Sequence, residues 1–342
     1  MSQTRAVAKE NVLIRAGICA VTILPHFGGK IASIRVGETE LLQSPLAPYA
    51  PRTRAMDFAA GDASGWDECL PSVAACTVET AAGTARIPDH GDLWRVEWRD
   101  RRQWAVDSDR LGGGEALVTL RGDCFSLPLE LERTVTLAES ESGWELGLGY
   151  RVGNTGSFAS PWSWAAHPLF AVDRGDRISL PNRIRTLRLE DSRDNRLGKS
   201  GDTISWPTAQ SPNGATIDLS TAQSPGSAVG DKLFAGPFGS SIGLSARSGI
   251  ASSHEGCASL ERLQLGLRLT VQFEPSLTPY LGLWLCYGGW PDSPGTKQIC
   301  VALEPSTAPV DSLATKGDWA RHLEPGETST WPMELHIERI EK

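Results

Sequence analysis

The chain has 342 residues, of which 40% are hydrophobic and 22% charged, and its formal net charge is −8. This composition is ordinary for a folded protein and excludes disorder as its main character. The acidic excess provides no basic surface of the kind that nucleic acids and anionic membranes require, so we expect neither as a partner. No apolar run approaches the roughly 18 residues of a membrane span, and the opening sequence MSQTRA lacks a signal-peptide core, which predicts a cytoplasmic protein.

The seven cysteines are an odd number and contain no Cys-x-x-Cys motif. This pattern disfavours a disulfide framework and a structural zinc site, and it predicts reduced, mostly buried thiols. Three short motif matches lack the context that their chemistry needs: GSSIG at 239–243 without a helix, GKS at 198–200 without the first P-loop glycine, and an acidic run at 190–195 without calcium-loop spacing. We predict no cofactor and no metal.

Glycine and proline, at 35 and 22 residues, indicate frequent turns. Apolar residues alternate with polar ones in several segments, as half-buried strands require. These segments are 127–137, 144–150, 263–273 and 333–337. The glycines at 112–114 predict a hairpin turn between flanking strands. Only short stretches such as 313–319 have room for a helical turn, so the chain is predicted to be all-β.

A single domain over residues 5–340 fits this pattern best. The polar, turn-rich segment 191–227 is interpreted as a long surface excursion rather than a domain boundary, and no repeat of fixed period is present. A large antiparallel β-sandwich accommodates so many alternating strands.

Two of the six histidines have unusual neighbours. His90 lies in the sequence PDHGDLW at 88–94, a predicted turn before a strand, where a glycine permits a close backbone approach. His167 follows the aromatic sequence PWSW and precedes Pro168, which is expected to end strand pairing. A histidine there is half shielded from water, so its pKa is adjustable around neutrality. The simpler interpretations are a surface turn histidine and a core histidine.

Glu304 is the candidate general base. The largely apolar strand predicted at 298–303 runs directly into it. A carboxylate at the end of a buried strand is costly unless it is paired or used in chemistry. Twelve tryptophans are many for this length. Their flat faces pack well on sugar rings, although core packing accounts for most of them, so we expect two or three at most to contact a ligand.

Together these residues resemble the aldose 1-epimerase (galactose mutarotase-like) superfamily, and the resemblance runs along nearly the whole chain. The matching segments are HFGGKIASIR at 26–35, GWDECLP at 65–71, DHGDLW at 89–94, WAAHP at 164–168, LEP at 303–305 and LEPGE at 323–327. The resemblance implies the large β-sandwich of that superfamily and a reaction that opens and recloses a sugar ring at its anomeric carbon.

The resemblance also implies residue roles. Glu304 takes the proton from the C1 hydroxyl while His167 gives one to the ring oxygen. His90 holds charge near the ring oxygen, and Asp231 binds a sugar hydroxyl. A positioned acid and a positioned base each contribute about 10²–10⁴-fold in rate, so the two suffice without metal or cofactor.

Two departures from the superfamily pattern concern the substrate. Region 46–67 lacks the Asn and the Gly-Arg pair typical of galactose mutarotases, which counts against galactose. The residues before Gly65 lack the Arg typical of hexose-6-phosphate epimerases, although Arg52 or Arg54 offers a substitute donor. Asp67 and Glu68 are instead predicted to accept hydrogen bonds from a neutral sugar.

Two other functions stay open from the sequence. One is a non-catalytic carbohydrate-binding or sensing protein on the same sandwich, which has no use for Glu304 as a base. The other is a glycosidase or polysaccharide lyase, which would release reducing ends from an oligosaccharide. In the leading interpretation the partner is a small sugar, and the chain is a monomer or a homodimer.

Overall fold

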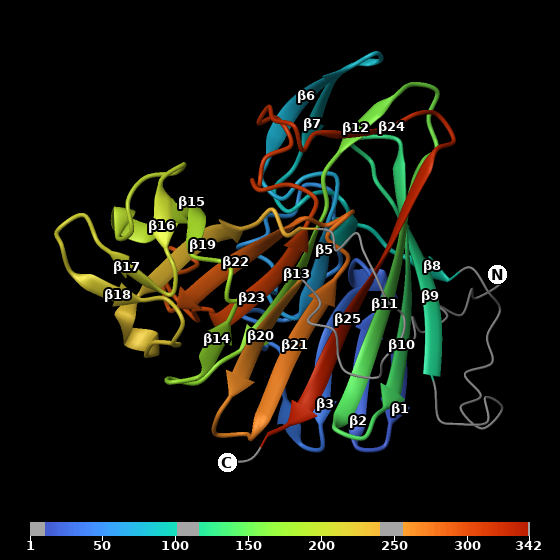
Figure 1. Ribbon diagram of the computed structural model, residues 1–342. Coiled ribbons are helices and arrows are strands. Elements are labelled where there is room, and N and C mark those ends of the chain that lie inside the picture. The colour runs from blue at the N-terminus through green and yellow to red at the C-terminus, as the bar shows by residue number, and fades with distance from the viewer. Residues whose placement is uncertain (1–10, 101–115, 240–255, 341–342) are drawn as a thin grey trace.

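The computed structural model describes residues 11–100, 116–239 and 256–340. Within these ranges the regular structure consists of β-strands and short 3-10 turns, and two large antiparallel sheets form the body of the molecule (Figure 1). The predicted all-β sandwich is confirmed. No helix in the described ranges is long and apolar enough to cross a membrane.

The larger sheet contains β1 (Val12–Ala16), β2 (Cys19–Leu24), β3 (Lys30–Val36), β4 (Thr39–Glu40), β5 (Trp66–Cys69), β13 (Ala165–Ala171), β15 (Thr186–Ser192), β16 (Thr203–Ser205), β19 (Val229–Ala235), β22 (Tyr280–Tyr287) and β23 (Ile299–Ser306). Their spatial order is β1-β2-β3-β5-β13-β23-β22-β19-β15-β16, and β4 pairs with β3. Strands β13, β23 and β22 are therefore neighbours in the middle of the sheet, where hydrogen bonds on both sides hold them.

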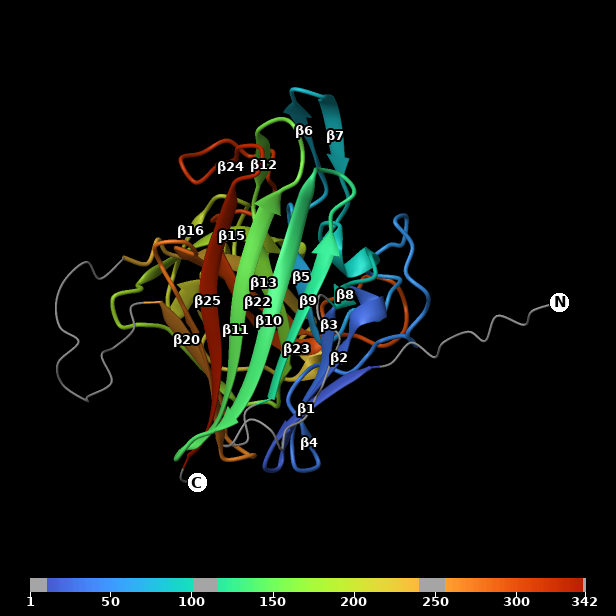
Figure 2. The same ribbon diagram turned by 90° about the vertical axis from the view of Figure 1, so that its right-hand side faces the viewer.

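The second sheet contains β8 (Arg99–Asp100), β9 (Ala116–Asp123), β10 (Leu129–Glu139), β11 (Gly143–Asn154), β14 (Arg177–Ser179), β20 (Cys257–Arg262), β21 (Leu267–Phe273) and β25 (Thr328–Arg339). Its spatial order is β14-β20-β21-β25-β11-β10-β9-β8. Figure 2 shows the long strands of this sheet in front, with β13, β22 and β23 of the larger sheet behind them. The two sheets thus form the layers of a sandwich.

Smaller elements lie outside the two large sheets. They are the strand pairs β6 (Cys76–Thr80) with β7 (Gly83–Ile87), β12 (Ser160–Trp162) with β24 (Arg321–Leu323), and β17 (Thr208–Gln210) with β18 (Thr216–Asp218), and the 3-10 turns η1 (Pro25–Phe27), η2 (Leu93–Arg95), η3 (Arg193–Asn195) and η4 (Pro225–Ser227). The predicted excursion at 191–227 contains β16, β17 and β18, at the left of Figure 1. Through β16 it remains attached to the larger sheet.

Three of the four alternating segments lie largely in β10, β11 and β25, as predicted. On β10, Leu131 and Val135 are fully buried, whereas Thr134 beside them is partly exposed. The fourth segment starts differently, because residues 263–266 form a turn and β21 begins only at Leu267. Period-2 patterning therefore identified the strands but not every strand end.

Some predictions from the sequence are corrected or lie outside the described residues. The hairpin predicted at 112–114 lies outside them, as does nearly all of the GSSIG sequence at 239–243. Residues 313–319 form turns and bends rather than a helical turn. Pro168 ends only the pairing of β13 with β5, since β13 continues to Ala171 by pairing with β23.

Alternation of side chains across the larger sheet decides which residues meet at the site. We call the face toward the second sheet the inner face and the opposite face the outer face. Leu283 and Leu303, a registered pair on β22 and β23, belong to the main core cluster on the inner face. The next registered pair, Gly282 and Glu304, therefore points to the outer face.

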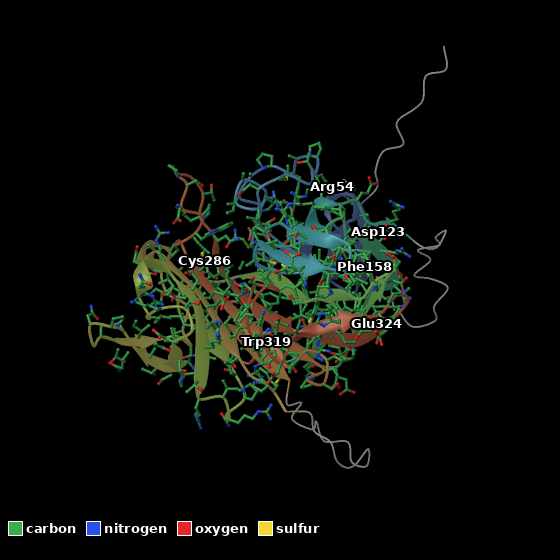
Figure 3. The ribbon with its side chains drawn as sticks, turned by 90° about the horizontal axis from the view of Figure 1, so that it is seen from above. Arg54, Asp123, Phe158, Cys286, Trp319 and Glu324 are labelled. Atoms are coloured by element: carbon green, nitrogen blue, oxygen red, sulfur yellow. The ribbon has the colours of Figure 1, made fainter. Side chains whose placement is uncertain are left out.

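All seven cysteines lie in the described residues, where four are buried, three are partly buried and none forms a disulfide. In the view from above (Figure 3), Cys286 of β22 and Asp123 of β9 lie on opposite sides of the molecule, in keeping with their different sheets. The thiols therefore act as packing groups within this fold.

Candidate active site

The centre of the candidate site is a pair of side chains on adjacent central strands. The register of β13 with β23 pairs Ala165 with Ser306 and Leu169 with Ala302, and continuing it between these pairs brings His167 opposite Glu304. The two side chains reach the outer face, and Nε2 of His167 lies 3.8 Å from Oε1 of Glu304. Both residues are almost completely buried, at 5% and 1% exposed. Residues 137 positions apart in the sequence are thus held together by the strand register, as the resemblance implied.

Two polar atoms of this pair have no hydrogen-bond partner among the described residues. They are Nδ1 of His167 and Oε1 of Glu304, and both are buried. Buried polar atoms are nearly always paired in folded proteins, so each of these atoms is available to a water molecule or a ligand. An imidazole and a carboxylate at this separation are groups that can donate and accept protons.

The protonation state of His167 follows from its surroundings. Burial lowers the pKa of His167 well below its ordinary value, and the positive charges of His90, Lys232 and Lys30 act in the same direction. His167 is therefore a neutral imidazole at pH 7. It can donate one hydrogen bond, but it carries no second proton to give away.

His90 reaches the same place from a strained turn. Its backbone has a φ of +58°, and its backbone N–H donates to the carbonyl of Val73. The ring stacks on Phe58 with 3.7 Å between centroids, and its centroid lies 5.0 Å from that of His167. Nδ1 of His90 lies 2.8 Å from Oδ2 of Asp89. The turn leads into the 3-10 turn η2 and not directly into a strand as predicted.

Gly91 fixes the position of this turn. Its φ is +68°, and a Cβ atom at Gly91 would lie 2.3 Å from the carbonyl oxygen of Leu70. Arg95 adds hydrogen bonds from Nη1 to the carbonyl oxygens of Asp89 and Gly91. The requirement for glycine next to His90 is therefore steric as well as conformational.

Lys232 is a charged residue of this cavity that the sequence analysis did not single out. It lies on β19, and its Nζ donates a hydrogen bond to Oε2 of Glu304 and lies 3.6 Å from Oδ1 of Asp311. Burial alone would lower the pKa of Lys232, but Asp311 and Glu304 outweigh burial and raise it above its ordinary value. Burial raises the pKa of Asp311 to about 6, although the Lys232 ammonium opposes this. The site thus holds a row of alternating charges.

A cavity of about 190 Å³ opens beside His167, Lys232 and Asp311. Glu304 is not among its lining residues, but it contacts Lys232 and lies 3.8 Å from His167, and both of these line it. The cavity is lined by Phe58, Val73, Ala74, Asp89, His90, His167, Asp191, Lys232, Trp284, Trp290, Gln298 and Asp311. Trp284 donates from its indole nitrogen to Oε1 of Gln298 at 3.0 Å, which fixes one wall. The cavity combines aromatic surface with convergent polar groups, the usual composition of a small-molecule site.

The structure does not bring Asp67, Glu68 or Asp231 to this cavity. Asp67 faces outward beside His167, but its Oδ2 accepts a hydrogen bond from the buried ammonium of Lys30 at 2.5 Å. Asp62 contacts the same ammonium at 3.1 Å. Asp67 is thus part of a buried ion cluster beside the cavity.

Glu68 and Asp231 point to the inner face, because each is one residue away from an outward-facing neighbour. Glu68 accepts hydrogen bonds from Arg133, Tyr150 and Trp164 at 2.9, 3.0 and 2.9 Å. Asp231 accepts from Ser192 at 2.7 Å and from Arg196. Both carboxylates are fully buried and already engaged by side chains of the protein.

The two arginines considered as phosphate donors also lie away from the cavity lining. Arg52 pairs with Asp62 in the buried ion cluster, and the Arg54 guanidinium lies 4.9 Å from the centre of the Phe125 ring. Within the described residues, no group of three or more His, Cys, Asp and Glu side chains is arranged to hold a metal ion.

No family model matches the sequence, and no curated relative matches it. Several solved structures are similar to this chain. Slr1438 from Synechocystis sp. PCC 6803 has a TM-score of 0.65 at 18% identity and covers 99% of both chains. A proposed aldose 1-epimerase from Escherichia coli K12 has a TM-score of 0.64 at 16% identity, over 97% of this chain and 99% of that one. The chain has the galactose mutarotase-like fold.

A galactose mutarotase-like protein from Clostridium acetobutylicum gives the same result, with a TM-score of 0.64 at 18% identity over 96% of this chain and 95% of that one. The resemblance seen in the sequence motifs is therefore confirmed at the level of the fold. At these identities the likeness concerns the fold, and the chemistry has to be argued from the residues of this chain.

Proposed function

We propose that this protein is a sugar 1-epimerase, or mutarotase, which interconverts the α and β anomers of an aldose by opening and reclosing its ring. The galactose mutarotase-like fold supports the carbohydrate class, and the residues in the cavity support the reaction type. Anomer exchange needs one group that removes the proton of the C1 hydroxyl and another that protonates the ring oxygen.

The observation that carries the proposal is the unpartnered oxygen of Glu304. Oε1 is buried, lacks a hydrogen-bond partner among the described residues and lies 3.8 Å from Nε2 of His167, a residue that lines the cavity. A C1 hydroxyl placed there satisfies that oxygen and gives it a proton to remove. Because the oxygen is already desolvated, the base needs little reorganisation when the sugar binds.

The cavity fits one sugar ring better than a chain of them. Its volume of about 190 Å³ is below the roughly 300–1,000 Å³ of sites for drug-sized ligands. The indole rings of Trp284 and Trp290 offer apolar surface for a ring face, and Gln298 offers polar groups for hydroxyls. This size favours a monosaccharide over the oligosaccharide that a glycosidase or a lyase would require.

In the proposed reaction, Glu304 accepts the C1 hydroxyl proton as the bond between C1 and the ring oxygen breaks. His90 and His167 donate hydrogen bonds toward the ring oxygen while negative charge develops there. The open aldehyde rotates about its C1–C2 bond and recloses on its other face. Lining carboxylates Asp89 and Asp191 favour a sugar without negative charge, since an anion would be repelled.

Magnetisation-exchange NMR between the α and β anomers tests the proposal with glucose, galactose and related aldoses. The wild-type protein is expected to accelerate exchange of at least one sugar. Glu304→Gln should reduce the catalysed rate by about 10²–10⁴-fold while leaving the fold intact. Glu38→Gln is the matched control, because Glu38 is fully exposed on a surface turn, and it should keep the wild-type rate.

A wild-type protein that binds a sugar but catalyses no exchange would contradict the proposal and favour a carbohydrate-binding or sensing protein. Release of reducing ends from an oligosaccharide would instead identify a glycosidase or a lyase. An unchanged rate in Glu304→Gln would remove the assigned base.

A further inference from the structure

Building on the proposed function, we infer that Lys232 is the catalytic acid: it gives a proton to the ring oxygen, and Lys232 and Glu304 act as one hydrogen-bonded acid–base pair. In this assignment Glu304 acts through its free oxygen and Lys232 through its ammonium group. His167 remains a hydrogen-bond donor to the ring oxygen.

The sheet is built to let these two side chains meet. Lys232 is on β19 and Glu304 on β23, so the lysine side chain must cross the intervening strand β22. It crosses at Gly282, the registered partner of Glu304. A Cβ atom at Gly282 would lie 3.0 Å from Oε2 of Glu304 and 3.3 Å from Nζ of Lys232. Glycine therefore leaves the space that the ion pair occupies.

The two oxygens of Glu304 have separate tasks. Oε2 accepts the hydrogen bond from Nζ of Lys232, whereas Oε1 is orphaned among the described residues. Lys232 lines the cavity and Glu304 is hydrogen-bonded to it, so the pair places an acceptor and a protonated donor next to one small cavity. The two reacting oxygens of an aldose are both bonded to C1, so an acid and a base side by side match them.

Lys232 holds a proton at neutral pH and His167 does not. The pKa of Lys232 is raised by Asp311 and Glu304, and the pKa of His167 is lowered by burial first. Lys232 lines the cavity with only 7% of its side chain exposed, so its ammonium faces the ligand rather than bulk water. A proton donor is thus present where His167 lacks one.

Charged or titratable groups approach Lys232 from several of the elements packed around it, whereas the adjacent strand β22 places Trp284 and Gly282 there. These groups are Glu304 on β23, Asp311 in the following loop, His167 on β13, Cys69 on β5, Asp191 on β15 and His90 in its turn. Two carboxylates, Glu304 and Asp311, hold the ammonium directly. When Glu304 accepts a proton from the sugar, one of these charges disappears, so Lys232 becomes a stronger acid at the moment it is needed.

Glu304 and Lys232 together account for every proton and electron pair that moves during ring opening and closure. On ring opening, the O1–H bond breaks and its proton goes to Oε1, while the electrons form the C1=O1 bond. The C1–O5 bond breaks with its electron pair on O5, which takes a proton from Nζ. An uncharged amine and an uncharged carboxylic acid remain. On reclosure the amine takes the O5 proton back and the acid returns its proton to O1, so no other reactant is consumed.

Lys232→Arg separates charge from proton transfer. The guanidinium keeps the positive charge beside Glu304, but it does not give up a proton within a protein. We expect kcat to fall by about 10²–10⁴-fold with KM changed by less than threefold. Circular dichroism and urea unfolding verify that the variant folds.

Lys232→Ala supplies the second test through chemical rescue. Methylammonium, which carries both charge and proton, should restore a measurable part of the lost rate. Tetramethylammonium, which carries charge alone, should not. The wild-type profile of kcat/KM should show no basic limb between pH 6 and 9, since the ionising acid is a lysine.

Lys232→Arg with a rate within threefold of wild type, or equal rescue by both ammonium ions, would overturn the inference and leave the proposed function in place. A basic limb near pH 6–7 that disappears in His167→Gln would return the acid role to His167. A wild-type protein that catalyses no exchange would overturn the proposed function, and this inference with it.

Discussion

His167 and Glu304 lie opposite each other on two adjacent central strands, with 3.8 Å between Nε2 and Oε1. This distance is too long for a hydrogen bond between the two atoms. Hydrogen bonds along both edges of β13 and β23 hold their backbones. The distance between the two groups is therefore a property of the strand register, and a ligand need not reorganise the backbone to use it.

The buried neutral state of His167 predicts a pH-dependent stability. Its pKa in the folded protein is well below the ordinary value, so only the unfolded chain takes up a proton as pH falls below about 6.5. The contribution of His167 to stability is present above that pH and is lost below it, by up to about 1.4 kcal/mol per pH unit. Urea unfolding between pH 7.5 and 5.5 should show this slope in wild type and lose it in His167→Gln.

His322→Gln is the matched control, because His322 is exposed and lies outside the cavity lining. It should keep the wild-type slope. Equal slopes in wild type and His167→Gln would mean that His167 is protonated in the folded protein.

From the raised pKa of Asp311 we expect a dependence of stability on pH that is opposite in sign to that of His167. The pKa of Asp311 in the folded protein is about 6, above the value of about 4 in an unfolded chain. The carboxyl group thus stabilises the fold at low pH, and this stabilisation is lost as pH rises through 6, by at most roughly 3 kcal/mol. The stability difference between wild type and Asp311→Asn should decline from pH 4 to pH 7. A constant difference would show that Asp311 is ionised throughout this range.

Glu68 predicts a loss of stability without a role in sugar binding. Glu68→Gln leaves Arg133 buried without a counter-charge, and removing one member of a buried ion pair costs about 3–5 kcal/mol. The midpoint of urea unfolding should fall strongly, while KM of the remaining folded protein stays near that of wild type. Arg133→Met combined with Glu68→Gln should recover part of the loss. A raised KM with unchanged stability would instead support the sugar-binding role predicted from the sequence.

Substitutions at Asp191 and Asp231 should differ in their effect on ligand binding. Asp191 lines the cavity, whereas Asp231 faces inward and binds Ser192 and Arg196. Asp191→Asn should weaken binding of an unreactive 1,5-anhydro sugar by several-fold, as measured by titration calorimetry. Asp231→Asn should lower stability and leave that affinity unchanged. The reverse pattern would assign the sugar contact to Asp231.

The fold could be predicted from the sequence because strand periodicity is local. Residues two apart share a face, so buried Leu131 and Val135 already define a strand without knowledge of its neighbours. The pairing of His167 with Glu304 is not local, and motif resemblance alone brought those residues together. Strand register then supplied the geometry that no sequence pattern contains.

Lys232 was missed for the same physical reason. The motif around β19 directed attention to Asp231, and a shift of one residue along a strand changes the face of the sheet. Whether Asp231 or Lys232 faces the cavity depends on the pairing of β19 with β15 and β22, which are distant from it in the sequence. The partners of Glu68 are equally distant in sequence, since Arg133 lies 65 residues further on. Gly282 lies beside the Lys232–Glu304 pair, and its significance becomes visible only when the register of β19, β22 and β23 is known.

The cavity has a floor of sheet residues and a wall of loop residues, Phe58, His90 and Trp290. Under the proposed function, substitutions at these loop positions should change which sugar fits, while the strand residues His167 and Lys232 keep their positions in the sheet.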